Sequence, residues 1–357
     1  MAWKQGLSER STLDELLEEL GNRLPDGWQV DIGEEPRGPT DLGVDAILTI
    51  AGPGGQQARV VVDVRRSIDP ASAANSALRL SAARLSSGAD GSLLVAPFLS
   101  PRTREVLRDR GVGYADLTGN VWLSLAKPAL FLELHGDDRG PVPDTRSIRS
   151  LRGPASGRVV RGLLDLRPPY TITQLKDRIG VPLASIYRVI DFLQSEAILA
   201  REPRGPVAEL DWRALLARWT NDYGFTSSNR TGTFLDPRGA LSALDKVRSA
   251  RMRSAVTGSM AAMGPRAAPG RLLAIYVEDL RAASEALDLR EVESGTNIIL
   301  AEPFDEVVFE RTRCMDDITY AAAAQVAADL LTGPGRWPQE GEAMIVWMTE
   351  NEDAWRA

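Results

Sequence analysis

Two short amphipathic segments in the middle of the chain are joined by a turn that few residue types permit. The first spans 172–179 and is followed by Gly180, which readily adopts the left-handed conformation that ends a helix. Either Thr171 or Thr173 can cap this helix, because a threonine hydroxyl accepts a hydrogen bond from a free N–H of the first turn. Pro182 suits the first position of a second helix. The pattern therefore predicts two helices separated by a tight turn.

The second helix, expected from Pro182 to about Glu196, divides into two faces. Aliphatic residues at three- and four-residue spacing form the buried face: Ile186, Val189, Ile190 and Leu193. The remaining residues form the exposed face: Leu183, Ala184, Ser185, Tyr187, Arg188 and Asp191. Small polar residues and an arginine outside, with aliphatic residues inside, are typical of a helix-turn-helix whose second helix enters the major groove of DNA.

The segments on either side complete a larger motif. A helix is expected over 157–166, before the paired prolines 168–169, and the stretches 198–201 and 207–210 are expected to pair as a hairpin. The whole stretch resembles the winged helix-turn-helix of bacterial transcriptional regulators such as the IclR and MarR types. Its segment GVPLASIYRVIDFLQSEAIL is similar to their recognition-helix consensus.

This resemblance implies double-stranded DNA as the partner. The candidate contacts to bases or phosphates are Ser185, Tyr187 and Arg188 on the second helix, and the candidate contacts to the DNA backbone are Arg201 and Arg204 on the hairpin. The DNA-binding set is completed by the two threonines at the start of the first helix, Thr171 and Thr173. The alternative is a winged helix that makes protein contacts only.

Charge is unevenly distributed along the chain. Between residues 139 and 204 there are twelve basic and six acidic residues, so this stretch carries about +6 in a chain of net charge −7. A cationic centre in an anionic protein is the usual footprint of a contact with a polyanion. The alternative is a solvated linker beside an ordinary surface.

The 357 residues suggest two or three domains. We expect a mixed α/β and α+β multidomain fold with boundaries at 1–135, a basic linker at 136–154 rich in Gly, Pro and Arg, the winged helix at 155–212, and a final domain at 213–357.

The first domain is expected to pack helices on both sides of a small mixed sheet. The expected helices are 13–24, 71–85 and 100–110, and the expected strands are 44–50, 59–64, 92–96, 113–117 and 121–125. This order resembles the restriction-endonuclease-like fold, in which a carboxylate on one strand and a Glu/Asp-x-Lys on the next hold Mg²⁺.

The matching residues here are Asp45, Asp63 and Arg65. Arg65 stands where that family has lysine, and a permanently charged guanidinium does not replace a tunable amine. We therefore interpret these three residues as vestigial candidates of a degenerate nuclease site. The alternative is a Mg²⁺-dependent nuclease with a divergent active site.

The final domain resembles a nucleotidyltransferase. Thr257, Gly258 and Ser259 are followed by a strand at 272–277 that ends in Glu278 and Asp279. In that family a Gly-Ser turn holds the nucleotide phosphate and two acids on the next strand bind Mg²⁺. Adjacent strand residues point to opposite faces, so the metal site is expected to be broken. The favoured alternative is a helix start in which Ser259 caps residues 260–263.

Four further segments carry a resemblance that covers most of the chain. They are GVGYADLTGNV (111–121), VTGSMAA (256–262), NIILAEPFDEVVF (297–309) and QVAADLLTGPG (325–335). Together they resemble AbiEi-type antitoxins of type IV toxin–antitoxin systems. The resemblance implies a transcriptional regulator that represses its own operon, with the end domains used for sensing or dimerisation. A homodimer is the expected assembly, a toxin protein bound through protein contacts is the alternative partner, and single-stranded DNA is a candidate signal.

The cysteine and histidine content limits which metal sites and catalytic groups the chain can form. The chain has one cysteine, Cys314, and one histidine, His135, so we expect no internal disulfide, no metal centre, no cofactor and no catalytic residue. No stretch of about 18 apolar residues occurs, so we expect no membrane contact and a cytoplasmic location.

Overall fold

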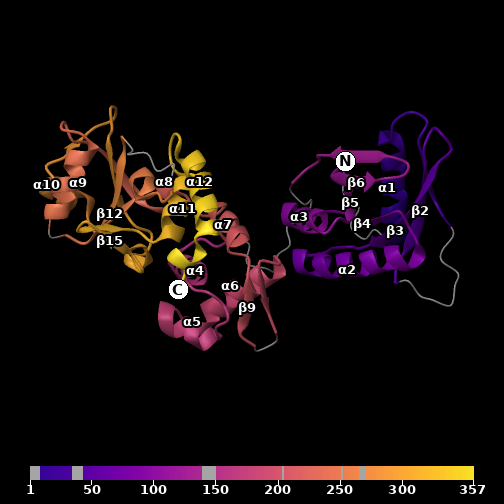
Figure 1. Cartoon of the computed structure of the whole chain (residues 1–357), viewed down its shortest axis with the longest axis horizontal. Coiled ribbons are helices and arrows are strands. Elements are labelled where there is room, and N and C mark those ends of the chain that lie inside the picture. Colours follow the sequence, from indigo (N-terminus) through magenta and orange to yellow (C-terminus); the bar gives the residue numbers. More distant parts are fainter. Residues whose placement is uncertain (1–8, 34–42, 139–149, 203–204, 251, 265–270) are drawn as a thin grey trace. The chain divides into compact units, whose positions relative to one another are not determined.

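A computed structural model describes residues 9–33, 43–138, 150–202, 205–250, 252–264 and 271–357 (Figure 1). The chain divides into two compact units, one of residues 1–147 with 194–197 and the other of residues 148–193 with 198–357. Each unit combines helices with a mixed sheet. Among the described residues, no helix is both long enough and apolar enough to cross a membrane.

The first unit is built on a seven-stranded sheet whose spatial order follows the chain. Its strands are β1 (Gln29–Ile32), β2 (Ala46–Ala51), β3 (Gln57–Val64), β4 (Gly91–Ala96), β5 (Gly113–Asp116), β6 (Val121–Leu125) and β7 (Leu130–Leu134). The central strands β3, β4 and β5 are parallel, and every other pair is antiparallel. The helices are α1 (Glu9–Arg23), α2 (Pro70–Ser87) and α3 (Pro101–Asp109).

Helices cover both faces of this sheet, as expected from the sequence. Alternate residues of β3 point to opposite faces, so Val60 and Val62 pack with α1 while Val61 packs with α2 and α3. Two parallel crossovers place α2 and α3 on the same face. Strand β1 was not predicted from the sequence, although its four residues alternate polar and apolar side chains, because so short an alternation is a weak signal. Only Val30 of the four is even half-buried.

The second unit holds most of the central segment and a second sheet. The central segment contains α4 (Pro154–Asp165), α5 (Ile172–Ile179), α6 (Leu183–Ser195), β8 (Leu199–Arg201) and β9 (Val207–Leu210). The sheet has the order β13-β10-β14-β12-β11-β16-β15. Its strands are β10 (Arg230–Leu235), β11 (Ser254–Thr257), β12 (Leu273–Val277), β13 (Arg290–Glu291), β14 (Ile298–Glu302), β15 (Arg313–Met315) and β16 (Ile318–Tyr320).

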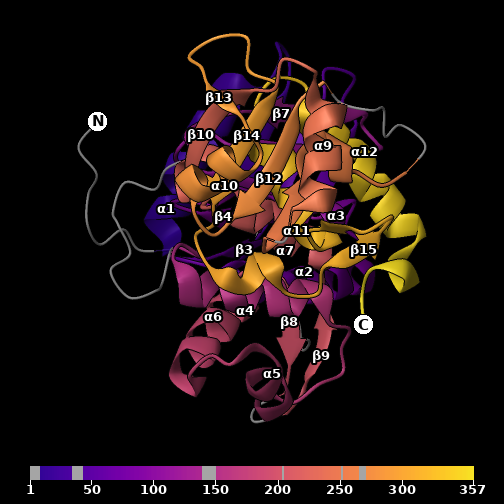
Figure 2. The ribbon, with the colours of Figure 1, turned by 90° about the vertical axis from the view of Figure 1, so that its left-hand side faces the viewer.

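Helices flank this sheet on both sides as well. They are α7 (Trp212–Thr220), α8 (Phe225–Ser228), α9 (Ala240–Ser249), α10 (Leu280–Ala286), α11 (Ala323–Thr332) and α12 (Trp337–Glu350), with short 3₁₀ turns η1 (Gly258–Ala261), η2 (Glu306–Phe309) and η3 (Glu352–Ala354). Figures 1 and 2 show α9 and α10 on one side of the sheet and α11 and α12 on the other.

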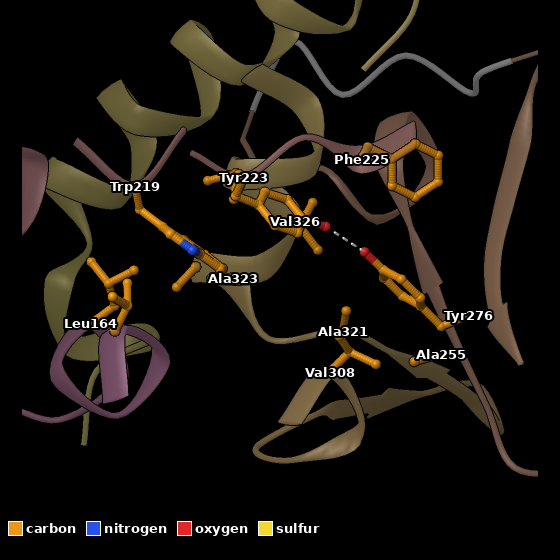
Figure 3. Close-up of a cluster of buried hydrophobic side chains, with 14 of the residues drawn as sticks. Leu164, Trp219, Tyr223, Phe225, Ala255, Tyr276, Val308, Ala321, Ala323 and Val326 are labelled. Atoms are coloured by element: carbon orange, nitrogen blue, oxygen red, sulfur yellow. Dashed lines mark hydrogen bonds between the residues drawn. The ribbon is translucent and has the colours of Figure 1, made fainter. Parts of the chain in front are cut away.

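One hydrophobic core runs from the helices α4, α5 and α6 into this sheet. Figure 3 shows its centre, where Leu164 of α4 and Trp219 of α7 lie near Tyr223 and Val326. The boundary placed near residue 212 therefore falls inside the second unit. Burial of this shared apolar surface packs the central helices and the sheet together.

The turn after β11 corrects one expectation. Ser259 does not cap a helix; η1 begins at Gly258, and Ser259 lies within it. Gly258 has a φ of +67°, and a Cβ there would lie 2.5 Å from the Trp337 ring. Both the backbone conformation and the close approach of the ring therefore require glycine at this position.

Candidate nucleic-acid interface

The first helix of the motif begins with a capping box. The Thr171 hydroxyl accepts a hydrogen bond from the Gln174 N–H at 3.2 Å, and the Gln174 side-chain oxygen accepts one from the Thr171 N–H at 2.8 Å. Of the two candidate caps, Thr171 therefore fills the role, and Thr173 is exposed in the first turn. Gly180 ends the helix with a φ of +65°, which confirms the reason for a glycine at this turn.

The second helix, α6, has the two faces expected from its sequence. The aliphatic set Ile186, Val189, Ile190 and Leu193 is at most 2% exposed. On the opposite face Tyr187 is 41% exposed, Arg188 is exposed and Ser185 is half-buried. Arg188 forms no hydrogen bond or ion pair with any described residue. The outer face of α6 therefore offers an uncommitted guanidinium beside an aromatic ring.

A hairpin follows α6, as predicted. Strands β8 and β9 are antiparallel, and Tyr170 adds an isolated bridge to Val207, so the hairpin is hydrogen-bonded to the chain just before α5. Arg204 lies outside the described residues. Arg201, at the end of β8, is only 12% exposed, because its guanidinium lies on α6.

Several basic residues that gave the segment its positive charge are engaged inside the unit. Arg161 is completely buried, and Arg158 pairs with Asp305 at 2.8 Å and with Glu310. Arg167 pairs with Asp353. These three residues lie on or just after α4 and hold it against the rest of the unit. The positive charge available to a partner is therefore smaller than the count along the sequence suggests.

Among the described residues of α5 and α6, three basic side chains are exposed. Arg178 and Arg188 are exposed without a described partner, and Lys176 lies 3.7 Å from Asp177 in an exposed pair worth little to stability. An α-helix of this width fits the major groove, where an arginine can bond a guanine edge bidentately. The arrangement can thus support base recognition by α6 and phosphate contacts from α5.

A buried polar network ties the motif to the sheet. Arg161 of α4 donates to the Gln325 side-chain oxygen at 2.9 Å and to Asp165 at 3.1 Å, and Arg311 donates to the same Asp165 at 2.6 Å. Gln325 in turn donates to Asp329 at 2.8 Å. This network was not predicted from the sequence, although two polar residues four positions apart in the apolar segment 323–332 are a signal for it.

Asp329 is the end of that network and lies in the core. Its carboxylate also accepts hydrogen bonds from the hydroxyls of Thr257, Tyr223 and Tyr276, and the two tyrosine hydroxyls meet at 3.0 Å (Figure 3). Burial disfavours the charged form and raises the pKa of Asp329 to about 6, although the hydrogen bonds from Thr257, Tyr223, Gln325 and Tyr276 oppose this shift.

The two acids of the nucleotidyltransferase-like pattern form a helix cap and an ion pair. Asp279 caps α10 by accepting a hydrogen bond from the Ala282 N–H at 2.7 Å, and Glu278 pairs with Arg253 at 3.1 Å. Asp305 likewise accepts a hydrogen bond from Val307 at the start of η2. Within the described ranges, no three Asp, Glu, His or Cys side chains gather where they could share a metal ion.

The vestigial candidates lie in the first unit, at the end of β3. Asp63 is 2% exposed and forms a two-point contact with the Arg65 guanidinium, at 2.7 and 3.1 Å, and Arg79 of α2 lies 3.4 Å away. Asp45 precedes β2 and accepts a hydrogen bond from the Val64 N–H at 2.6 Å. Burial raises the pKa of Asp63, Arg65 opposes this, and the nearby charge of Asp45 raises it further.

The structure thus places Thr171 and Thr173 at the start of α5, and Ser185, Tyr187 and Arg188 on α6. It also brings Arg201 onto α6. The pair Asp45 and Asp63, with Arg65, forms a separate cluster in the first unit. Of the two sets, only the first combines an exposed helix face with an uncommitted basic side chain. In comparisons with known proteins, no family model and no curated protein matches this chain.

Proposed function

We propose that the chain is a sequence-specific, double-stranded DNA-binding transcriptional regulator whose α6 helix enters the major groove. The observation that carries the proposal is the outer face of α6, where Arg188 is exposed without a described partner beside the half-exposed Tyr187. The fully buried aliphatic face of the same helix fixes which side is presented. The tight turn at Gly180 and the hairpin β8–β9 complete a winged helix-turn-helix arrangement.

The start of α5 supports the same proposal. Helix N-termini carry partial positive charge, and Thr173 exposes a hydroxyl there that can donate to a phosphate oxygen. The Thr171 hydroxyl is engaged by Gln174 and holds the start of the helix in place. Lys176 and Arg178 are exposed on the same short helix. These groups suit contacts with the phosphates of the DNA backbone, which set the position of α6 along a duplex. The helix α6 itself supplies the contacts with bases.

The experiment that tests this function is selection of bound duplexes by the purified full chain from a pool with about 20 random base pairs, a length that spans two half-sites one helical turn apart. Sequencing of the retained fraction is expected to show an enriched motif. Retention without any enriched motif, or no retention at low salt, would contradict sequence-specific binding.

The variant Arg188→Ala is expected to weaken binding to the selected duplex by about tenfold or more and to relax the preference at one base pair, since a bidentate arginine–guanine contact is worth about 1–3 kcal/mol. Fluorescence anisotropy with the selected and a scrambled duplex measures both effects. The control is Arg281→Ala, which removes the same charge from α10 on the far side of the sheet, where Arg281 is 89% exposed. Equal losses in both variants would show that only net charge matters.

We propose a homodimer as the DNA-binding form, because two-fold symmetry lets two copies of α6 contact two half-sites about 34 Å apart. The end domains would then serve sensing or dimerisation, with a toxin protein or single-stranded DNA as the candidate partner or signal. Sedimentation velocity of the free chain and of its complex with the selected duplex measures the stoichiometry. A one-to-one complex on a motif without two-fold symmetry would contradict the dimer.

A Mg²⁺-dependent nuclease is the second candidate function, favoured only by the proximity of Asp45 and Asp63. The contacts argue against it, because Asp63 is buried and both of its oxygens are engaged by arginines. We therefore expect no cleavage of a labelled duplex in Mg²⁺ or Mn²⁺ by the wild-type chain. Cleavage by the wild-type chain that disappears in Asp63→Ala would instead establish the nuclease.

A further inference from the structure

The last residue of β8 lies against the helix that we propose enters the groove. The Arg201 guanidinium is 5.5 Å from the centre of the Tyr187 ring and its Nη2 is 2.5 Å from an Asp191 oxygen. Tyr187 and Asp191 are four residues apart, so they are neighbours on one side of α6. Arg201 is 12% exposed while Asp191 is 62% exposed. The arginine is therefore packed beneath the two side chains rather than extended toward solvent.

This geometry addresses two problems that a groove-entering helix faces. A bare carboxylate at Asp191 would be repelled by the phosphates, and the ion pair with Arg201 cancels its charge. A tyrosine on an exposed helix face can occupy several rotamers, and a guanidinium over the ring restricts it through a cation–π contact. Fixing the ring before binding lowers the entropy lost when the complex forms.

We propose that Arg201 is a positioning residue that holds the Tyr187 ring and neutralises Asp191, so that Tyr187 meets a thymine methyl group in the major groove. The inference rests on the DNA-binding function proposed above and assigns its recognition chemistry. It also replaces the sequence-based expectation that Arg201 contacts the DNA backbone. An apolar ring edge suits the thymine methyl, which is the one apolar group that base pairs present in that groove.

The test uses full-length variants and the duplex selected by the wild-type chain. Arg201→Met removes the guanidinium but keeps an apolar stem, and we expect about tenfold weaker binding and a flattened preference for thymine at one position. Adding Asp191→Asn to Arg201→Met removes the uncovered carboxylate, and we expect it to regain at least about threefold in affinity. Asp191→Asn alone is expected to bind at least as tightly as the wild type.

A phosphate contact would behave differently. If Arg201 touched the DNA backbone, Arg201→Met and the double variant would be equally weak, all sequences would lose affinity alike, and the slope of log K against log [salt] would fall by about one. That result would overturn the positioning role. Arg201→Lys keeps the charge and loses the planar ring contact, so it is expected to retain affinity but lose thymine preference.

Two further measurements distinguish an unfolded variant, a wrong proposed function and a wrong positioning role. Thermal unfolding of each variant, followed by circular dichroism, is expected to match the wild type within a few degrees, because Asp191 is largely exposed and Arg201→Met keeps the apolar stem. If the wild-type chain selects no motif, the proposed function is wrong and the positioning role falls with it. If the wild-type chain selects a motif and Arg201→Met binds it with unchanged affinity and preference, only the positioning role is wrong.

Discussion

Replacing Arg161 with alanine is expected to lower the free energy of unfolding of the second unit by about 3–5 kcal/mol. Arg161 is completely buried and donates to Asp165, to the Gln325 side chain and to the Val307 carbonyl. Its removal leaves a buried carboxylate with less compensation and a buried amide oxygen without its donor. Urea titration followed by tryptophan fluorescence measures the change, because Trp219 is buried in the same core.

Two comparison variants sharpen this prediction. Arg161→Met restores most of the side-chain volume, so a loss close to that of Arg161→Ala would assign the effect to the unpaired polar groups rather than to a cavity. Arg281→Ala, in an exposed pair with Glu285, is expected to leave the midpoint unchanged. A loss below about 1 kcal/mol for Arg161→Ala would show that the network contributes no more than an exposed ion pair.

The stability of the second unit is also expected to fall as the pH rises through the titration of Asp329. Its pKa is about 6 in the folded unit, against an ordinary value of 3.8. The folded unit therefore binds the proton more tightly than the unfolded chain does. The resulting stabilisation is fully present below about pH 4 and is lost as the pH rises through 6, by about 3 kcal/mol in total.

The variant Asp329→Asn isolates this contribution. Asparagine does not titrate. Between pH 4 and pH 7 the free energy of unfolding of the wild type is therefore expected to fall relative to that of Asp329→Asn. Every other titrating group is common to both chains and cancels in the difference. Urea titrations of both chains at four pH values measure it. A raised pKa at Asp329 would be contradicted if the difference between the two free energies of unfolding stayed constant, or if the wild type became relatively more stable as the pH rose.

The bounds of α5, of the turn at Gly180 and of α6 could be predicted from the sequence because their signals are local. The helix α5 has the predicted bounds, Ile172–Ile179, and α6 begins at Leu183, one residue after the predicted Pro182. Caps, glycine stops and three- and four-residue spacing act within one or two helical turns. The choice between Thr171 and Thr173 was not made from the sequence, although Gln174 stands three residues after Thr171, which is the spacing of a capping box. The hydrogen bonds with Gln174 identify Thr171 as the cap.

The role of each charged residue was harder to predict. Arg161 and Arg201 both counted toward a positive segment, yet one is buried against Gln325, 164 residues away, and the other lies on α6. Asp279 resembled a metal ligand by its position after a strand and caps α10 instead. Each outcome depends on which distant element packs beside the residue.

The sequence by itself determined local elements of the central segment: the helices α5 and α6, the turn at Gly180, the hairpin strands and the inward face of α6. Only the tertiary structure decided which polar groups are buried, which are paired and which are offered to a partner. The physical reason is that helix and turn preferences depend on neighbours a few residues away, whereas the free energy of a charge depends on its burial and on partners brought together by packing. Arg188 and Arg161 are the same residue type in the same segment, and packing alone leaves one exposed and encloses the other.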